Sequence, residues 1–483
     1  MSGDARALLG PDGPLAQRFS GYEERQGQLE MADAVERALA EERPLLCEAG
    51  TGTGKTLAYL VPAILSRKRV VVSTATRALQ EQVFHKDLPG IASGLGLRPE
   101  AALVKGLGNY LCLRRFHELR RSSAAVTDLG LGRSLPLVED WAEHTETGDA
   151  AELTALAEDD PLWREVSSSS ETRVGADCEY FDRCFVTRMK RDAERARILV
   201  VNHHLFFADL AVKEAAGPRA SAAGVLPRYD AVIFDEAHQL EDVATAHFGT
   251  RVSRARLETT LREAERAFAG SGLSDRLLSR GEGTALVGLV REAVVELFSW
   301  LAELCPRGEE GSSPRTPLPR EAWSGALVDA YHRLDTALET LGLYADANRI
   351  NDAVALVGER AQRLRHDAAS IVEHATQQVT WIESRPPRGS RRGTASGPPE
   401  VTAFGASPVE LGHLLRERIF DRVGAVVLTS ATLTTAADGF GFFRSRMGLA
   451  SPATGAGALS VSSPFDHPKN ALLYVPTDLP DAV

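Results

Sequence analysis

The sequence predicts an α/β fold built on a parallel sheet, and two observations lead to this prediction. Continuously apolar, valine-rich runs occur at 70–72, 198–201, 231–234 and 426–428, as expected for strands that are buried on both faces of a sheet. The second observation is a glycine-rich loop at 49–56, which lies between a predicted strand and a predicted helix. With 483 residues, the chain has room for roughly three domains.

Composition narrows the class of protein. Hydrophobic residues make up 43% of the chain and charged residues 25%, which is typical of a soluble globular protein and not of a disordered chain or a membrane bundle. The longest apolar runs, such as 57–65, are about half the roughly 20 residues of a membrane helix. The first residues lack the profile of a signal peptide, and five cysteines are too few for a disulfide scaffold. We expect a cytoplasmic protein with no membrane association.

The net charge is −11, from 55 basic and 66 acidic residues. This balance argues against a protein coated with nucleic-acid-binding charge. It leaves room for a local basic groove, because the acidic residues of a large protein can lie on faces that the substrate never meets.

The sharpest feature is the glycine-rich loop between a predicted strand at 43–47 and a predicted helix from Leu57 onward. It fits the pattern G-x-x-x-x-G-K-[ST] with alanine in the first position, and its residues are Ala49, Gly50, Thr51, Gly52, Thr53, Gly54, Lys55 and Thr56. Small residues let the backbone N–H groups wrap around phosphate oxygens. Lys55 is then expected to bind the β- and γ-phosphates of ATP, and the Thr56 hydroxyl to bind Mg²⁺. The flanking strand and helix disfavour the alternative, a chance glycine-rich turn.

A second acidic motif follows the apolar run 231–234, where Asp235 and Glu236 are followed by Ala237 and His238. Asp235, at the carboxyl end of a buried strand, is expected to hold Mg²⁺, and Glu236 to act as general base toward the attacking water. We expect His238 to couple the nucleotide to neighbouring motifs. Taken alone, such a tetrapeptide is more often a solvated helix start, but the phosphate loop favours the functional interpretation.

Upstream of the loop, Arg25 and Gln28 precede a predicted helix with apolar residues at 29, 31, 35 and 39. A glutamine amide can pair with both the N6 donor and the N7 acceptor of adenine, so Gln28 is a candidate base reader with Arg25 beside it. An ordinary polar helix start is the alternative.

Two more segments have hydroxyl-bearing residues after a predicted strand. Residues 73–76 and the amides at 80 and 82 follow the first and suit contacts to nucleic-acid phosphates that ignore base sequence. The string Thr429-Ser430-Ala431-Thr432-Leu433 ends the second and is a candidate link between the ATP site and a nucleic-acid site.

These motifs, in this order, resemble the DinG/XPD branch of the superfamily two DNA helicases, and within it the bacterial DinG-like members. The strings that narrow the resemblance to this branch are Lys105-Gly106 with Asn109-Tyr110-Leu111-Cys112, Val201-Asn202-His203-His204-Leu205, and Ser463-Pro464-Phe465-Asp466. The resemblance covers nearly all of the chain. It implies an ATP-dependent helicase that uses ATP and Mg²⁺, moves 5′→3′ on single-stranded DNA and unwinds duplexes at junctions in repair or replication. We expect it to act as a monomer.

The resemblance also implies a domain organisation. A RecA-like ATP-binding domain is expected from 1–104, 200–245 and 405–433, with an iron–sulfur-type insertion at 105–199 and a helical arch insertion at 246–404. The arch prediction agrees with two stripes of apolar residues at helical spacing. They are Leu286, Leu289, Val290, Ala293, Val294, Leu297, Leu301 and Leu304, and then Leu327, Tyr331, Leu334, Leu338 and Leu341. Pro386–Pro399 is typical of a flexible linker.

The cysteines fit an iron–sulfur cluster only in part. Relatives with a [4Fe–4S] cluster use four thiolates, and the resemblance matches Cys112, Cys178 and Cys184 to three of them. The stretch 167–177, where the remaining thiolate is expected, contains neither cysteine nor histidine. Two alternatives stay open: a cluster with a non-protein ligand on one iron, or a domain that keeps its fold by packing alone.

The run 183–197 has six basic and two acidic side chains. It is either an ordinary solvated helix face or a strip that follows the phosphates of single-stranded DNA. The chain as a whole has two further alternatives to a helicase: a nucleotide-dependent DNA-binding protein without unwinding activity, and a P-loop ATPase that acts on a protein or metabolite. The motifs disfavour the second of these.

Residues 434–483 are expected to begin a second RecA-like domain without completing it, since such a domain has about 150 residues. The arginine that this domain supplies to the γ-phosphate, usually from a Q-x-x-G-R-x-x-R segment, is not found in the sequence. We therefore expect this chain to bind ATP-Mg weakly or moderately and to hydrolyse it poorly.

Overall fold

The computed structural model of the chain describes residues 4–18, 22–121, 130–169, 172–173, 175–216, 224–270, 277–306, 315–373, 378–385 and 399–472. These residues form two compact units. One consists of Met1–Val243 and Gly412–Val483, and the other of Ala244–Leu411. The predicted linker Pro386–Pro399 lies, except for Pro399, outside the described residues.

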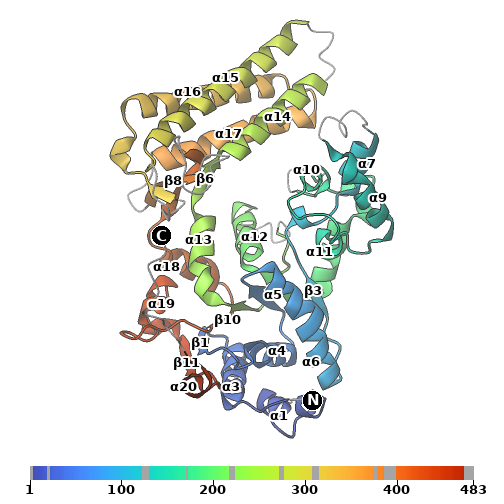
Figure 1. The fold of residues 1–483 in the computed structure, drawn as a ribbon, viewed down its shortest axis with the longest axis vertical. Helices are drawn as coiled ribbons and strands as arrows, with labels where there is room; N and C mark the ends of the chain where they lie inside the picture. The colour runs from blue at the N-terminus through green and yellow to red at the C-terminus, as the bar shows by residue number, and fades with distance from the viewer. Residues whose placement is uncertain are drawn as a thin grey trace. The chain divides into compact units, whose positions relative to one another are not determined.

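The first unit contains a sheet of seven parallel strands, which confirms the predicted α/β class (Figure 1). Strands at 70–74, 198–202, 231–235 and 425–430 include every apolar run that predicted them, and nearly all their side chains are buried. In order across the sheet, the strands are β11 (Gly457–Val461), β1 (Leu45–Ala49), β10 (Ala425–Ser430), β5 (Ala231–Asp235), β2 (Val70–Thr74), β4 (Ile198–Asn202) and β3 (Ala101–Leu103). Since all run the same way, their carboxyl ends meet at one edge.

Helices pack on this sheet through buried apolar side chains. The predicted helix after Gln28 is α3 (Gln26–Glu41), and Leu29, Met31, Val35 and Leu39 all lie buried in the core that it shares with α4 (Lys55–Leu65). The other helices before β3 are α1 (Ala5–Leu9), α2 (Pro14–Arg18), α5 (Arg77–Gln82) and α6 (Leu88–Leu95). Those near the later strands are α12 (His203–Ala216), α18 (Gly412–Leu415), α19 (Gly441–Arg446) and α20 (His467–Asn470), and α13 (Leu240–Phe248) spans the boundary of the units.

The segment between β3 and β4 forms a helical group of its own within the first unit. Its helices, drawn in teal in Figure 1, are α7 (Leu113–Arg121), α9 (Leu135–His144), α10 (Pro161–Val166) and α11 (Phe185–Arg195). Phe116, Val138, Trp163 and Phe185 are buried among them. This segment covers the range 105–199, and its assignment as an iron–sulfur-type insertion stays a prediction.

One expectation about the C-terminal segment is wrong. The strand β11 lies within 434–483, which the sequence assigned to a second domain, yet it belongs to the first sheet. It pairs in parallel with β1, with Leu46 opposite Ala458 and Ala49 opposite Val461. Exposed residues alternate with less exposed ones along this edge strand, Gly457-Ala458-Leu459-Ser460-Val461. Such a segment gives a weaker signal than the continuous runs of the central strands.

The second unit is a bundle of four long helices on a small antiparallel sheet. The helices are α14 (Arg254–Gly270), α15 (Leu277–Glu303), α16 (Gly325–Ala347) and α17 (Asp352–Val372), and the strands, in order, are β6 (Thr250–Ser253), β9 (Glu400–Pro408), β8 (Gln378–Arg385) and β7 (Arg315–Pro317). The predicted stripe on α16 is buried throughout. Along α15, Val290, Ala293, Val294, Leu297 and Leu301 of the predicted stripe are buried. Leu286 is partly buried, Leu289 is exposed, and the exposed Leu304 follows the end of the helix.

The sheet of the second unit also corrects a predicted boundary. Residues 405–408 were expected in the RecA-like domain, but they end β9, where Gly405 lies opposite Trp381 of β8 and Ala406 opposite Thr380. Helical periodicity at 246–404 gave no sign of this sheet, because β9 also pairs with β6, which lies far away in the sequence, with Thr250 opposite Ala406.

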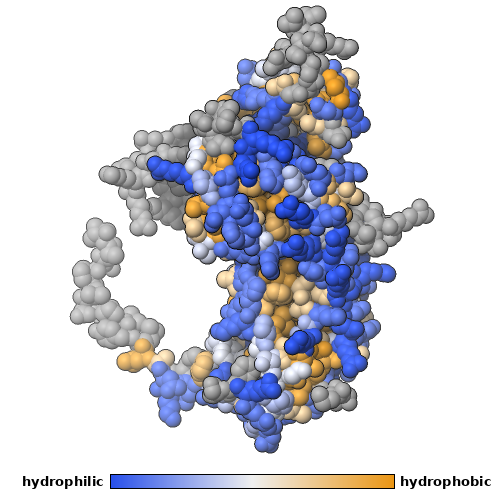
Figure 2. All heavy atoms as spheres, turned by 90° about the vertical axis from the view of Figure 1, so that its right-hand side faces the viewer, coloured by the Kyte–Doolittle hydropathy of each residue, from blue (hydrophilic) through white to orange (hydrophobic). Residues whose placement is uncertain are grey.

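Hydrophilic side chains predominate on the face drawn in Figure 2, with hydrophobic ones gathered mainly along its middle. Among the helices that the structure describes, none combines the length and hydrophobicity that a bilayer crossing requires.

Candidate nucleotide site

The glycine-rich loop lies where the sequence predicted it, between the carboxyl end of β1 and the first residue of α4. Gly52 and Gly54 have φ angles of +84° and +83°, which L-residues with side chains rarely adopt. The Thr53 hydroxyl donates a hydrogen bond to the Gly50 carbonyl at 2.7 Å and braces the turn. Because the loop ends in the N-terminus of α4, an anion held by it would meet the positive end of the helix dipole.

Replacing Gly54 with alanine should damage this loop in two ways. The positive φ angle costs about 1 kcal/mol, and a Cβ atom would lie 2.1 Å from the Gln28 amide nitrogen, so Gln28 must move. Gly96 offers a matched control, since its φ angle is +66° but no atom lies within 4 Å of an added Cβ. We expect both variants to lower thermal stability, and Gly54→Ala alone to weaken ATP-Mg binding measured by calorimetry. Equal ATP affinity of the two variants would contradict the prediction.

The predicted carboxylates reach the loop from β5, although β10 lies between β5 and β1. Asp235 ends β5 and is buried, while Glu236 follows in the left-handed region with a φ of 56°. The Lys55 ammonium lies 3.6 Å from a carboxylate oxygen of Glu236. The structure therefore brings together the lysine of the loop and both acidic residues.

Tyr59, on α4, is a member of the site that the sequence did not single out. Its hydroxyl donates a hydrogen bond to Asp235 at 3.0 Å, and the Thr56 side chain also reaches it. Tyr59 is completely buried. Its spacing of three residues from Thr56 places it on the same helix face, but a tyrosine in an apolar helix is usually ordinary core.

The electrostatics of this cluster suit a divalent cation. Burial, together with the charge of Glu236, raises the pKa of Asp235 to about 6, against the opposing effects of Tyr59 and Lys55. Two adjacent carboxylates with one ammonium leave a buried site short of positive charge. A hydroxyl, one or two carboxylates and phosphate oxygens are the ligands that Mg²⁺ commonly takes in nucleotide sites, so Thr56 and Asp235 fit this ion.

A polar contact links the acidic motif to the end of β10. The His238 ring nitrogen Nδ1 lies 2.8 Å from the Ser430 hydroxyl and 3.4 Å from a Glu236 oxygen. The same hydroxyl is also 3.4 Å from Glu236. A shift of the Glu236 side chain can therefore displace Ser430, either directly or through His238. Ser430 belongs to the string Ser430-Ala431-Thr432, called the S-A-T segment below.

A second link joins this segment to β1, and the sequence analysis missed it. Glu48 accepts hydrogen bonds from the backbone N–H groups of Leu433 and Thr434, each at 2.6 Å, and from the Thr434 hydroxyl at 2.8 Å. Burial would raise the pKa of Glu48, but these bonds hold it below its usual value. The only sequence signal was its place directly before the loop.

The candidate base readers lie against the loop. The Gln28 amide donates to the Gly54 carbonyl at 3.0 Å and accepts from the Tyr22 hydroxyl at 3.1 Å. The Arg25 guanidinium donates to the Gly52 carbonyl. Both residues thus hold the loop in this structure, and contact with a base stays a prediction for them.

The three candidate cluster ligands do not converge. Cys112 precedes α7, Cys178 follows a 3₁₀ turn and Cys184 caps α11, and each is partly exposed. In the part of the chain that the structure describes, no three Cys, His, Asp or Glu side chains are grouped so as to hold a metal ion. The thiols as arranged do not fit an iron–sulfur cluster.

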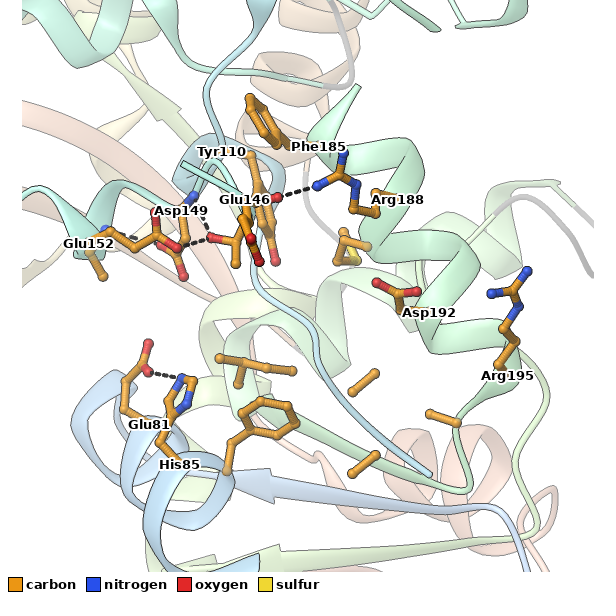
Figure 3. A pocket seen from close by; sticks show the side chains of 18 of the residues that line it. Glu81, His85, Tyr110, Glu146, Asp149, Glu152, Phe185, Arg188, Asp192 and Arg195 are labelled. Atoms are coloured by element: carbon orange, nitrogen blue, oxygen red, sulfur yellow. Dashed lines mark hydrogen bonds and ion pairs between the residues drawn. The ribbon is translucent and has the colours of Figure 1, made fainter. Parts of the chain in front are cut away.

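A cavity of about 900 Å³ lies between α5, β3, α11 and the segment around Asp149 (Figure 3). Acidic side chains outnumber basic ones on its wall, where Glu81, Glu146, Glu152 and Asp192 accompany Arg188 and Arg195, among others. A wall of this charge does not suit a phosphate backbone.

Several residues of the basic run are engaged within the protein. Arg188 donates to the Glu146 carbonyl and Lys190 to that of Gly224, while Arg191 pairs with Asp182 and Arg197 with Glu100. These contacts occupy Arg188 and Lys190 within the protein, while Arg191 and Arg197 stay at least half exposed in their ion pairs.

Comparison with known proteins identifies the family. Residues 28–106 match the model of the DEAD/DEAH box helicases. The chain is 32% identical to ATP-dependent DNA helicase YoaA of Escherichia coli (strain K12), over 97% of this chain and 68% of that protein. It is also 32% identical to ATP-dependent helicase DinG of Mycobacterium tuberculosis (strain H37Rv), over 96% of this chain and 68% of that protein.

Among solved structures, an XPD helicase resembles the chain with 12% identity and a TM-score of 0.44, over 91% of this chain and 62% of that one. The identities to YoaA and DinG extend over nearly the whole chain, so the motifs described above lie within the aligned range. The chain belongs to the DEAD/DEAH-box family of ATP-dependent DNA helicases that includes YoaA and DinG.

Proposed function

We propose that the protein uses ATP-Mg to move along single-stranded DNA and to unwind duplexes. The observation that carries this proposal is the continuous set of contacts from Lys55 through Glu236 and His238 to Ser430. It connects the phosphate loop with the S-A-T segment at the carboxyl edge of one sheet. The names of the relatives, which are ATP-dependent helicases, support it.

At the ATP site, the loop at 49–56 wraps the phosphates with its backbone N–H groups. Lys55 neutralises charge on the β- and γ-phosphates, while Thr56 and Asp235 hold Mg²⁺. Glu236, which is partly exposed, orients the attacking water and takes its proton. Tyr59 fixes the Asp235 carboxylate through its hydrogen bond, so it positions a metal ligand without touching the nucleotide.

In this proposal the two units contain different domains of the helicase. The first unit contains the RecA-like ATP-binding domain and the insertion between β3 and β4, and the second is the helical arch. Movement in the 5′→3′ direction, action at duplex junctions in repair or replication, a monomeric state and a cytoplasmic location rest on the family resemblance and stay predictions. The alternative is a nucleotide-dependent DNA-binding protein that does not unwind.

Hydrolysis of ATP with and without single-stranded DNA tests the proposal. We expect oligo(dT) to raise the hydrolysis rate of the protein, whatever its basal value. Glu236→Gln should lower the DNA-stimulated rate by about 10²-fold or more, because general-base catalysis contributes typically 10²–10⁴-fold, and should leave ATP-Mg binding within a few-fold. Hydrolysis that ignores DNA would contradict the helicase proposal, and a fully active Glu236→Gln would contradict the role of Glu236.

A further inference from the structure

The glycine-rich loop has an outer face, made by its carbonyl groups, and three side chains cover it. Arg25 donates to the Gly52 carbonyl, Gln28 to the Gly54 carbonyl and Ser463 to the Thr51 carbonyl, the last at 2.8 Å. A phosphate site uses the opposite, N–H face of such a loop. The outer face is therefore built separately, from two segments that lie far apart in the sequence.

The second of these segments, 463–465, comes directly after β11 in the sequence and lies close to the loop. The Val461 carbonyl accepts a hydrogen bond from the Gly50 N–H at 3.0 Å. A Cβ atom on Gly50 would lie 2.6 Å from the Ser463 nitrogen. The string Ser463-Pro464-Phe465 thus runs along the loop, and its last residue arrives beside Gly52.

The Phe465 ring packs on the backbone of Gly52. An added Cβ at Gly52 would lie 2.3 Å from one ring atom and 2.6 Å from another. The ring is nevertheless 52% exposed, unlike the buried Phe443 of α19. Gly52 therefore lies between a guanidinium that binds its carbonyl and an aromatic ring that keeps a large open surface.

An aromatic ring and a guanidinium are the two kinds of side chain on which nucleobases stack. The triphosphate of a nucleotide occupies the N–H face of the loop, and its base must find another surface within reach. The outer face offers Phe465 and Arg25 for stacking, whereas the Gln28 amide is buried and hydrogen-bonded to Gly54 and Tyr22.

We propose that Phe465 is a base-binding residue of the ATP site and that the purine ring stacks on it beside Arg25. This inference rests on the proposed function of the loop as an ATP site. It assigns the Ser463–Asp466 string to the nucleotide, so that a bound base contacts the chain that leaves the last strand of the sheet.

Calorimetric titration with ATP-Mg and with magnesium tripolyphosphate, which has no base, tests the proposal. Phe465→Ala should weaken ATP-Mg binding roughly tenfold and leave the tripolyphosphate affinity within about twofold, because stacking involves the base alone. Phe465→Trp should bind ATP at least as tightly as the native protein. Phe442→Ala is a matched control, since Phe442 is 57% exposed on α19.

The outcomes separate the two proposals. If Phe465→Ala changes both affinities equally, or tightens both, the ring packs on or blocks the phosphate loop and does not bind the base, so the inference fails. If the native protein binds neither ligand, or if Lys55→Ala leaves both affinities unchanged, the ATP site itself fails.

Discussion

Replacing Lys55 with alanine should weaken ATP-Mg binding about tenfold to a hundredfold. A hydrogen bond to a charged group contributes about 1.5–3 kcal/mol, and every 1.4 kcal/mol corresponds to a factor of about ten in affinity. The Lys55 side chain is mostly shielded from water, and its nearest carboxylate is Glu236. In the variant, that carboxylate and the γ-phosphate would repel each other without the ammonium of Lys55 beside them.

The change is measured by titrating ATP-Mg into the native protein and the variant. Lys68→Ala serves as the control, because Lys68 lies in the same unit but pairs with Glu42, which is largely exposed. The control should bind like the native protein. If Lys55→Ala binds ATP-Mg as tightly as Lys68→Ala does, the loop does not hold the phosphates.

Replacing Lys105 with methionine should destabilise the first unit by about 3 kcal/mol or somewhat more, since breaking a buried ion pair by removing one partner costs about 3–5 kcal/mol. The Lys105 side chain is 3% exposed, and its ammonium pairs with Glu81 and with Asp149, the latter at 2.5 Å. Glu81 is partly exposed, which favours the lower end of that range. Methionine keeps an unbranched side chain, one atom shorter, and removes the ammonium with its charge and its N–H donors.

Lys105 is also the residue that ties three segments together. It follows β3, Glu81 lies on α5 and Asp149 lies in the helical segment between β3 and β4. We therefore expect the loss of Lys105 to loosen this segment first. Hydrogen exchange read by mass spectrometry should show faster exchange at 101–111 and 145–152.

Two further variants test whether the lost stability comes from the buried ion pairs of Lys105. Asp149→Asn added to Lys105→Met should recover part of the lost stability, because one unpaired buried charge is removed with its partner. Lys68→Met should cost less than about 1 kcal/mol, as is usual for a surface ion pair. If Lys105→Met exchanges no faster than Lys68→Met, the buried network does not hold the segment.

The central strands and the phosphate site could be predicted from the sequence because their signals are local. A strand that is buried on both faces is continuously apolar, as at 231–234 and 426–428. The loop needs glycine at fixed positions, and Gly52 and Gly54 do adopt positive φ angles. Lys55 and Glu236 are brought together because parallel strands end at one edge.

Contacts made across the sheet could not be predicted in the same way. Tyr59 reaches Asp235 over a separation of 176 residues, and Glu48 reaches Leu433 over 385. No sequence pattern near Tyr59 or Glu48 predicts these hydrogen-bond partners, since a buried tyrosine and a glutamate beside a loop are common. Only the order of the strands, with β10 between β1 and β5, explains why these pairs meet.

The positions of two strand segments at the domain boundaries could not be predicted either. Exposed and less exposed residues alternate in β11, which was assigned to a separate domain. Gly405 and Ala406 pair with β6 across a long interval of sequence. For both segments, the position is decided by the strand that they pair with, and this partner is not encoded in local periodicity.

The proposed coupling of the ATP site to single-stranded DNA through His238 and Ser430 is tested most directly by binding of both ligands. The affinity of the protein for ATP-Mg is measured with and without saturating oligo(dT), and the affinity for oligo(dT) with and without ATP-Mg. We predict that each ligand changes the affinity for the other by the same factor, about fivefold or more, and that His238→Ala brings this factor close to one. If both ligands bind the native protein and neither affinity depends on the other ligand, the coupling does not exist.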